Sequence, residues 1–292
     1  MKILYHLFLS CKLFDRSWLQ HFACVLILNV ALLATSVLNA QAQLVIPVEG
    51  ARGASYITGD ISVNQAFHQA LNEAKVNAMN LAGISEHISS YAALLTSQVN
   101  NDFSEFFSGE TMTEIQGAVR SHTVVKQEKS VDSETGIIKL NVEINAEVIR
   151  YETKPDPTFD AMVTGVKPVY SHGETLTFTV ESSQNAFLHI FNITDTESFL
   201  LFPNSIEKDN QIFARQPRLF PSDKLEYYLE IGKKNPETNR LVFVFTKQPL
   251  AYLRIEQQEY DQVVDNDHIF TWIYSIPPDQ RLLIPVSFVI RK

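Results

Sequence analysis

The stretch Phe187–Asn204, FLHIFNITDTESFLLFPN, decides the fold of the second half of the chain. Residues 187–193 are rich in β-branched and aromatic side chains, which predicts a strand. A polar turn at 194–197 and a return strand at Ser198–Phe202, ended by Pro203-Asn204, complete a β-hairpin. Apolar side chains occupy both faces of the first strand. Because such strands are usually covered on both sides, we expect it to be a central strand.

Further short strands are predicted on both sides of this hairpin, with polar or glycine turns between several of them. They are expected at Met162–Val166, Thr175–Val180, Gln211–Ala214, Leu225–Ile231, Leu241–Lys247 and Arg281–Arg291. Residues 235–239 are expected to form one of the turns. A short helix is expected just before Pro277-Pro278. This pattern is typical of an immunoglobulin-like β-sandwich, here over residues 158–292 with a C-terminal helix and strand.

The region 43–152 predicts one long helix instead. From Val63 to Leu81 apolar residues recur at three- and four-residue steps, and Ser62 with Gln65 fits a capping box at the start. The alanines of this stripe favour close packing on a sheet. Helical spacing resumes after Gly83. Phenylalanines at 103, 106 and 107 are expected to pack a loop or short helix onto the core, with a partner-binding surface as the alternative.

Strands are expected on both sides of the helical part. Leu44–Ile57 predicts an irregular strand pair interrupted by glycines. Val119–Glu128 and Gly136–Ile149 alternate between apolar and polar residues and predict an antiparallel hairpin with one wet face, turning at 132–136. The fold class is therefore α+β, with a small antiparallel sheet packed on one long helix and then the sandwich. The proline-containing segment 153–157 is expected to link the two domains.

Residues 1–42 have the composition of an export signal. Basic residues at 2, 12 and 16 precede an uncharged apolar run at 22–38, and Ala40-Gln41-Ala42 fits a signal-peptidase site. We expect cleavage after Ala42. An uncleaved membrane anchor near the membrane surface remains the alternative, because the run has about the minimum length for a span. Either form places the protein in the periplasm or outer envelope of a bacterial cell.

Cysteine usage and charge exclude several chemistries for residues 43–292. Both cysteines, Cys11 and Cys24, precede this region, so it has no disulfide, thiolate metal site or cysteine nucleophile. Lipidation at Cys24 is not expected, because the apolar run follows that residue. The first 42 residues contain three of the 24 basic and one of the 33 acidic residues, which leaves a net charge of −11. That charge argues against a nucleic-acid partner.

No catalytic or cofactor-binding motif occurs, so we predict a protein that is not an enzyme and has no cofactor. The histidines beyond the signal are scattered. His189 lies in an apolar strand and is expected to be a structural residue with one hydrogen bond. Asp261, Asp265 and Asp267 could form a carboxylate site for a hard cation. A helix N-cap explains Asp265 or Asp267 without a metal, so no metal, catalytic or cofactor residue is assigned.

Two segments of the first domain carry a family resemblance. They are Gln65–Leu81, QAFHQALNEAKVNAMNL, and Leu140–Ile149 at the end of the predicted hairpin. In this order, after a short strand, they resemble the N-terminal domain of flagellar assembly protein T and the related LPP20-like envelope domains. The resemblance implies an exported envelope protein without catalytic residues, and it transfers no functional residue to this chain.

The second domain carries a stronger resemblance, in an ordered series of blocks. The blocks are VYSHGETLTF at Val169–Phe178, Asn185–Phe191, LLFPN at Leu200–Asn204, Asn210–Ile212, Phe220-Pro221 and FVFTK at Phe243–Lys247. The series is similar to the DUF4384 domain, a domain of unassigned function, over about residues 157–253. The resemblance implies an exported or envelope-associated β domain that is often fused to other modules. It supplies no activity.

These observations favour a non-enzymatic cell-envelope protein that acts as a protein-interaction or scaffold module, with another envelope protein as its partner. The alternative is a glycan- or lipid-binding module with exposed Tyr227, Tyr228, Tyr252 or Trp272 as a platform. An enzyme with a dispersed site would need two carboxyl groups that converge in a pocket.

Overall fold

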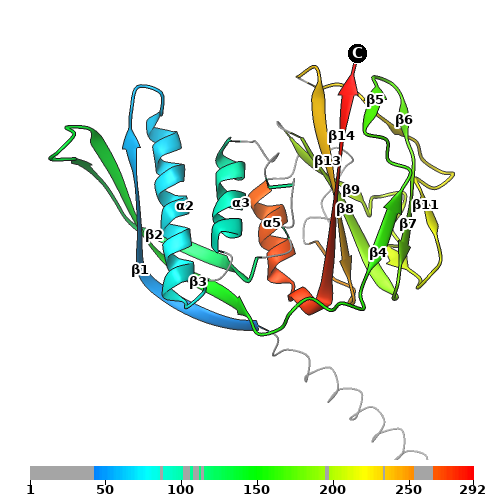
Figure 1. The fold of residues 1–292 in the computed structure, drawn as a ribbon, viewed down its shortest axis with the longest axis horizontal. Coiled ribbons are helices and arrows are strands. Elements are labelled where there is room, and N and C mark those ends of the chain that lie inside the picture. The colour runs from blue at the N-terminus through cyan, green and yellow to red at the C-terminus, as the bar shows by residue number, and fades with distance from the viewer. Residues whose placement is uncertain are drawn as a thin grey trace, which may run out of the picture. The chain divides into compact units, whose positions relative to one another are not determined.

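The structure is a computed structural model. It describes residues 43–85, 88–100, 106–107, 112, 115–194, 197–232, 234–252 and 266–292. The predicted signal at 1–42 lies outside these residues. The fold is α+β and mostly β, with several sheets and three helices in the described part (Figure 1). Among the described residues, no helix is long and apolar enough to cross a membrane.

The first sheet is antiparallel, with β3 (Ile138–Tyr151) between β1 (Gln43–Ile57) and β2 (Gly117–Val131). The predicted strand pair at Leu44–Ile57 is wrong, because β1 is a single strand. A β-bulge between Val48 and Ala51 accommodates Gly50, whose φ of 68° suits a glycine. The bulge bends the strand without releasing it from the sheet. The hairpin of β2 and β3 was predicted and is confirmed.

Helix α2 (Val63–Leu81) packs on this sheet, and α3 (Ile88–Asn100) packs on α2. The predicted capping box is present, since the Ser62 side chain accepts from the Gln65 N–H and the Gln65 side chain accepts from the Ser62 N–H. Alanines fill the buried stripe of α2, which lets the helix approach β1 closely. A Cβ atom added at Gly53 would lie 2.1 Å from the carbonyl oxygen of Ala70.

The strands of the second region form three sheets. The largest has the order β10-β8-β13-β14-β5, and β9 also pairs with β8. Its strands are β10 (Gln211–Ile212), β8 (Ala186–Thr194), β13 (Glu237–Thr246), β14 (Arg281–Arg291), β5 (Val169–Ser171) and β9 (Ser198–Phe202). A three-stranded sheet contains β11 (Arg218–Phe220), β7 (Phe178–Ser182) and β4 (Ala161–Thr164), and β6 (Thr175–Leu176) pairs with β12 (Tyr227–Tyr228). Strands β5 and β11 were not predicted, and the pair β14–β5 is parallel.

Strand β8 is a central strand, as the sequence predicted. It pairs with β13 along one edge and with β9 and β10 along the other. Phe191 and Ile193 belong to apolar cluster 1, which also contains buried residues of helix α5 (Asn266–Ser275). Leu188 and Ile190 belong to apolar cluster 2, which also contains residues of β7 and β11. Both faces of β8 are therefore covered by apolar side chains. The immunoglobulin-like topology of the region remains a prediction.

Cluster 1 extends across the predicted linker at 153–157. It contains residues of the first sheet, such as Ile144, together with Phe191 of β8. The Tyr274 hydroxyl of α5 donates to the carbonyl of Met112 at 3.1 Å. Residues Gln43–Lys292 accordingly form one contact unit. The division into two domains at residues 153–157 stays a prediction.

The end of α5 is closed by a buried arginine. The Arg281 guanidinium donates to the carbonyls of Ile273, at 3.0 Å, and Ile276, which are at the C-terminal end of the helix. It lies 5.0 Å from the ring of Tyr151 and 4.9 Å from that of Tyr274. Burial raises the pKa of both tyrosines, so their hydroxyls stay protonated as donors. This arrangement joins β3, α5 and β14.

The predicted packing of the phenylalanines near 106 is confirmed where the structure describes them. Phe106 is fully buried and Phe107 is buried in cluster 1. The ring of Phe106 meets that of Phe270 edge to face at 5.6 Å between centroids. Position 103 lies outside the described residues.

Candidate functional site

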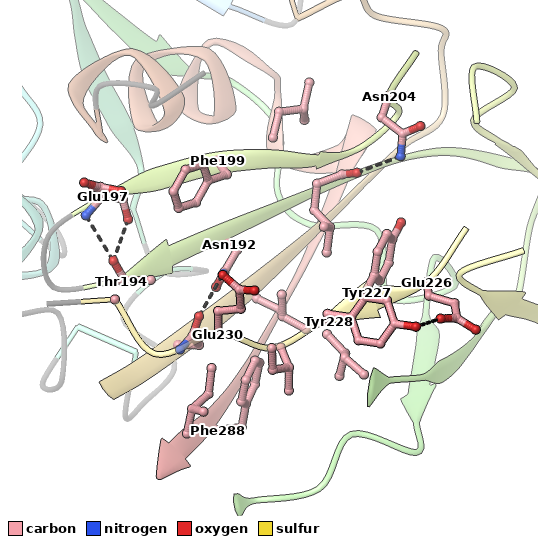
Figure 2. A pocket seen from close by; sticks show the side chains of 18 of the residues that line it. Asn192, Thr194, Glu197, Phe199, Asn204, Glu226, Tyr227, Tyr228, Glu230 and Phe288 are labelled. Carbon is pink, nitrogen blue, oxygen red and sulfur yellow. Dashed lines mark hydrogen bonds between the residues drawn. The ribbon is translucent and has the colours of Figure 1, made fainter. Parts of the chain in front are cut away.

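A pocket of about 610 Å³ lies beside the β8–β9 hairpin (Figure 2). One wall is β9 with the residues that follow it, and the other is the segment 225–232, which includes β12. The floor is formed by β8, the start of β13 and the end of β14. Much of the apolar lining belongs to cluster 2, so the pocket is where that cluster meets the surface.

Two asparagines meet at the floor of the pocket. Asn192 lies on the same face of β8 as Leu188 and Ile190, and β13 places Asn239 diagonally opposite, since Asn239 pairs with Thr194. The Asn192 Nδ2 donates to the Asn239 Oδ1 at 2.8 Å (Figure 2). The β8–β13 register therefore forms this pair, which residue spacing alone does not reveal.

The pair leaves hydrogen-bonding capacity unused. The Asn192 Oδ1 and the Asn239 Nδ2 are buried and have no partner among the described residues. Reversing both amides would exchange the free atoms but again leave one donor and one acceptor. Because a buried, unpaired polar group costs about 1–3 kcal/mol, and Asn239 is only 3% exposed, this floor is suited to a bound polar group.

Four glutamates give the pocket its charge, namely Glu197, Glu226, Glu230 and Glu237. Glu237 is buried and accepts from the Gly232 N–H, so its role is structural. Glu226 accepts from the Tyr228 hydroxyl, and this hydrogen bond raises the pKa of Tyr228. The described lining contains no lysine, arginine or histidine. The pocket therefore disfavours an anionic ligand.

The predicted aromatic platform is divided by the central sheet. Tyr228 lines the pocket and is 62% exposed. Tyr227 also lines it but is buried, and its hydroxyl donates to Glu207 at 3.2 Å. Tyr252 and Trp272 lie on the other face, in and against cluster 1. Of the four, only Tyr228 is an exposed ring, because the others fill apolar clusters.

His189 is buried, as predicted, at 1% exposure on the cluster 1 face of β8. Its ring meets Trp272 edge to face, with 4.8 Å between centroids. Its Nδ1 has no hydrogen-bond partner among the described residues. Burial lowers the pKa of His189 to about 4, so the imidazole is neutral at ordinary pH. It packs as an apolar ring and lies away from the pocket.

Of the three aspartates considered as metal ligands, the structure describes Asp267 alone. Asp267 lies within the first turn of α5 instead of preceding the helix, where its charge suits the helix dipole. Its Oδ1 is 3.6 Å from the Nζ of Lys75. Asp261 and Asp265 lie outside the described residues. Within the described ranges, no group of three His, Cys, Asp or Glu residues could hold a metal ion.

The pocket residues missed by sequence reasoning are Asn192 and Asn239. A polar amide inside the apolar strand at 187–193 was the available signal for Asn192. The sequence predicts a turn at 235–239, which includes Asn239, but β13 begins at Glu237. That earlier start brings Asn239 into the sheet, where it faces Asn192.

Residues 169–249 match the family model described as a domain of unknown function, DUF4384. The chain therefore contains a DUF4384 domain, which begins at β5 and ends just after β13. The match includes the β8–β9 hairpin, the segment 225–232 and both asparagines of the pocket floor. It confirms the resemblance stated for this part of the sequence. No curated protein matches the chain.

Proposed function

We propose that this protein is an exported, non-enzymatic cell-envelope protein that acts as a protein-interaction module through the free edge of β2. The composition of residues 1–42 supports export to the periplasm or outer envelope. The family model matches residues 169–249 alone, so the likeness of residues 43–152 to the flagellar assembly protein T and LPP20-like domains, which would imply the same location, is part of this proposal. Another envelope protein is the expected partner.

The observation that carries the interaction role is the exposed edge of the first sheet (Figure 1). In the described structure β2 pairs with β3 alone. Beyond Val119 the strand is exposed except at His122, which is half-buried. Val125 is 50% and Val131 67% exposed. An unpaired edge with exposed apolar side chains is suited to accept a strand from another chain.

Two bulges limit where such a strand can pair. They lie between Val119 and Ser121 and between Val124 and Lys126. From Lys126 to Val131 the register with β3 is regular, so the outer edge of this segment offers evenly arranged backbone groups. The expected partner therefore contributes a short extended segment with apolar side chains. The bulges and the lysines of β2 oppose indiscriminate pairing.

Charge substitution on the edge tests this role. Protein carrying Val125→Glu and Val131→Glu should capture less of a specific envelope partner than the unaltered protein, because a strand added there would bring its apolar residues against carboxylates. The matched control is Leu219→Glu on β11, which is also exposed, at 62%. Equal capture by both variants and the unaltered protein would count against the β2 edge.

The export part of the proposal has its own test. Protein recovered from the envelope should begin at Gln43, because the small residues at positions 40 and 42 define the cleavage site. Intact mass and N-terminal sequencing decide this. Protein that keeps residues 1–42 and stays with the membrane would support the uncleaved anchor.

A second candidate function, glycan binding, is favoured by the pocket beside β9. Amide groups and carboxylates contribute to its lining together with apolar side chains. Burying those polar groups against an acyl chain would be costly, so the pocket favours a glycan over a lipid.

A further inference from the structure

We propose that the pocket between β9 and the segment 225–232 is a site for a neutral saccharide. The Asn192–Asn239 pair would bind it at the floor and Tyr228 at the mouth. The inference rests on the glycan-binding candidate function, and it adds the position of the site, its contact residues and the charge class of the ligand. It is independent of the β2 edge, which belongs to another sheet.

The unpaired amide atoms define the first requirement on the ligand. One buried donor and one buried acceptor remain at the floor. A hydroxyl group can donate and accept at once, and an acetamido group offers one N–H and one C=O. A sugar supplies either group beside an apolar ring face. An ammonium group offers donors alone, so it would leave the Asn239 Nδ2 unpaired.

The carboxylates define the second requirement. Glu230 is exposed, and Glu226 keeps acceptor capacity beyond its bond to Tyr228. Carboxylates accept hydrogen bonds from sugar hydroxyls and repel anionic groups. Since the described lining contains no basic side chain, a uronic acid or a phosphate would find no counter-charge. The ligand is therefore a neutral sugar.

The exposed ring and the pocket size agree with this class. Tyr228 lines the pocket with an exposed ring, and the apolar C–H face of a sugar ring can pack against it (Figure 2). The volume of about 610 Å³ lies within the range of roughly 300–1,000 Å³ that is usual for small-molecule sites. The unpaired floor atoms are shielded from solvent, so binding requires a side-chain rearrangement at the floor of the pocket.

Titration of purified protein with N,N′-diacetylchitobiose and with cellobiose tests the proposal. We expect saturable binding of at least one disaccharide with a dissociation constant no weaker than about 10 mM, measured by calorimetry or NMR. Tyr228→Ala and Asn239→Ala should each weaken that binding roughly tenfold, the size expected for loss of one buried contact. Circular dichroism verifies the fold of each variant.

The matched control is Phe213→Ala, which removes another exposed aromatic ring, 50% exposed and outside the pocket. Its affinity for the disaccharide should equal that of the unaltered protein. A loss as large as that of Tyr228→Ala would overturn the proposed site.

Two further outcomes overturn the proposal in different ways. If neither disaccharide binds, and a lysine-containing peptide or a glucuronate disaccharide does so in a Tyr228-dependent manner, the neutral-saccharide class is wrong while a ligand site remains. If none of these four probes binds, glycan binding fails as a function too. Neither result bears on the β2 edge, whose variants are measured separately.

Discussion

Phe191 and Leu201 lie on the two strands of the same hairpin but differ in burial. Phe191 is fully buried, and its ring is 5.3 Å from Tyr252 and 5.8 Å from Trp272 between centroids. Leu201 is half-buried and packs against cluster 2 beside the pocket. Both residues are apolar, but their different burial means that they should contribute unequally to the free energy of unfolding.

Truncation of each residue should reveal this difference. Phe191→Ala should lower the free energy of unfolding by about 3–5 kcal/mol, because it leaves a cavity in a rigid cluster. Leu201→Ala should cost roughly half as much, since part of its surface is already in water. Urea denaturation measures both. Equal costs would contradict the burial difference, and an unchanged Phe191→Ala midpoint would exclude a central β8.

His189 makes stability depend on pH. Its pKa is lowered to about 4 by burial, whereas the pKa of a histidine in the unfolded chain is about 6.5. Between these values the unfolded chain binds a proton that the folded chain excludes. The contribution of neutral His189 is thus intact above the unfolded pKa and is lost as pH falls toward the folded one.

The expected loss for His189 is about 3 kcal/mol between roughly pH 6.5 and 4. A His189→Gln variant has no titrating group here, so its stability should fall less over the same interval. Urea midpoints at several pH values compare the two proteins. If the urea midpoints of the two proteins change with pH in parallel, His189 has the same pKa in the folded and unfolded states.

Elements were predicted best where one local pattern determines them. The stripe and the capping box of α2 are set by side chains within one or two turns of helix, and the structure has both. The β8–β9 hairpin likewise follows from a polar turn between two apolar runs. The sequence predicts two strands in place of β1, because Gly50 is a typical turn residue. In the structure the strand continues through Gly50, which lies in a β-bulge of the pairing with β3.

Because α2 lies close to β1, we expect Gly53 not to tolerate a larger side chain. At Gly53 a Cβ atom would lie 2.1 Å from the Ala70 carbonyl oxygen and 2.4 Å from the Ala74 nitrogen. These are backbone atoms, so the helix must shift to accept a methyl group. Gly53→Ala should therefore destabilise the protein by about 1–3 kcal/mol, the range of overpacking substitutions.

The control for Gly53 is Gly59→Ala, whose added Cβ would meet no atom within 4 Å. This variant should have nearly unchanged stability. Thermal unfolding measures both glycine variants. If Gly53→Ala and Gly59→Ala have the same melting temperature, α2 does not approach β1 at Gly53 as closely as the structure has it.

At the scale of the whole molecule, cluster 1 joins the two predicted domains. It contains residues of the first sheet, of α5 and of the sheet that includes β8. Trp272 packs against this cluster and is the only tryptophan after residue 42. Its ring meets His189, Phe191 and Tyr252, so its fluorescence reports on the packing around α5 within this cluster.

Because of this shared cluster, residues 43–292 should unfold in one cooperative transition. Urea curves from Trp272 fluorescence and from far-ultraviolet circular dichroism should coincide. A fluorescence transition that precedes the loss of circular dichroism would mean that the packing around α5 is lost before the strands and helices unfold.

The sequence by itself determined the α+β class, the hairpin at 187–204, the long helix and the DUF4384 resemblance. Each rests on spacing or residue order within a short segment. Only the tertiary structure decided that cluster 1 crosses the linker and that Tyr252 and Trp272 lie away from Tyr228. It also brought Asn192 and Asn239 together, since strand register joins residues that are distant along the chain. Local patterns set elements, whereas a binding pocket depends on which elements pair and in what register.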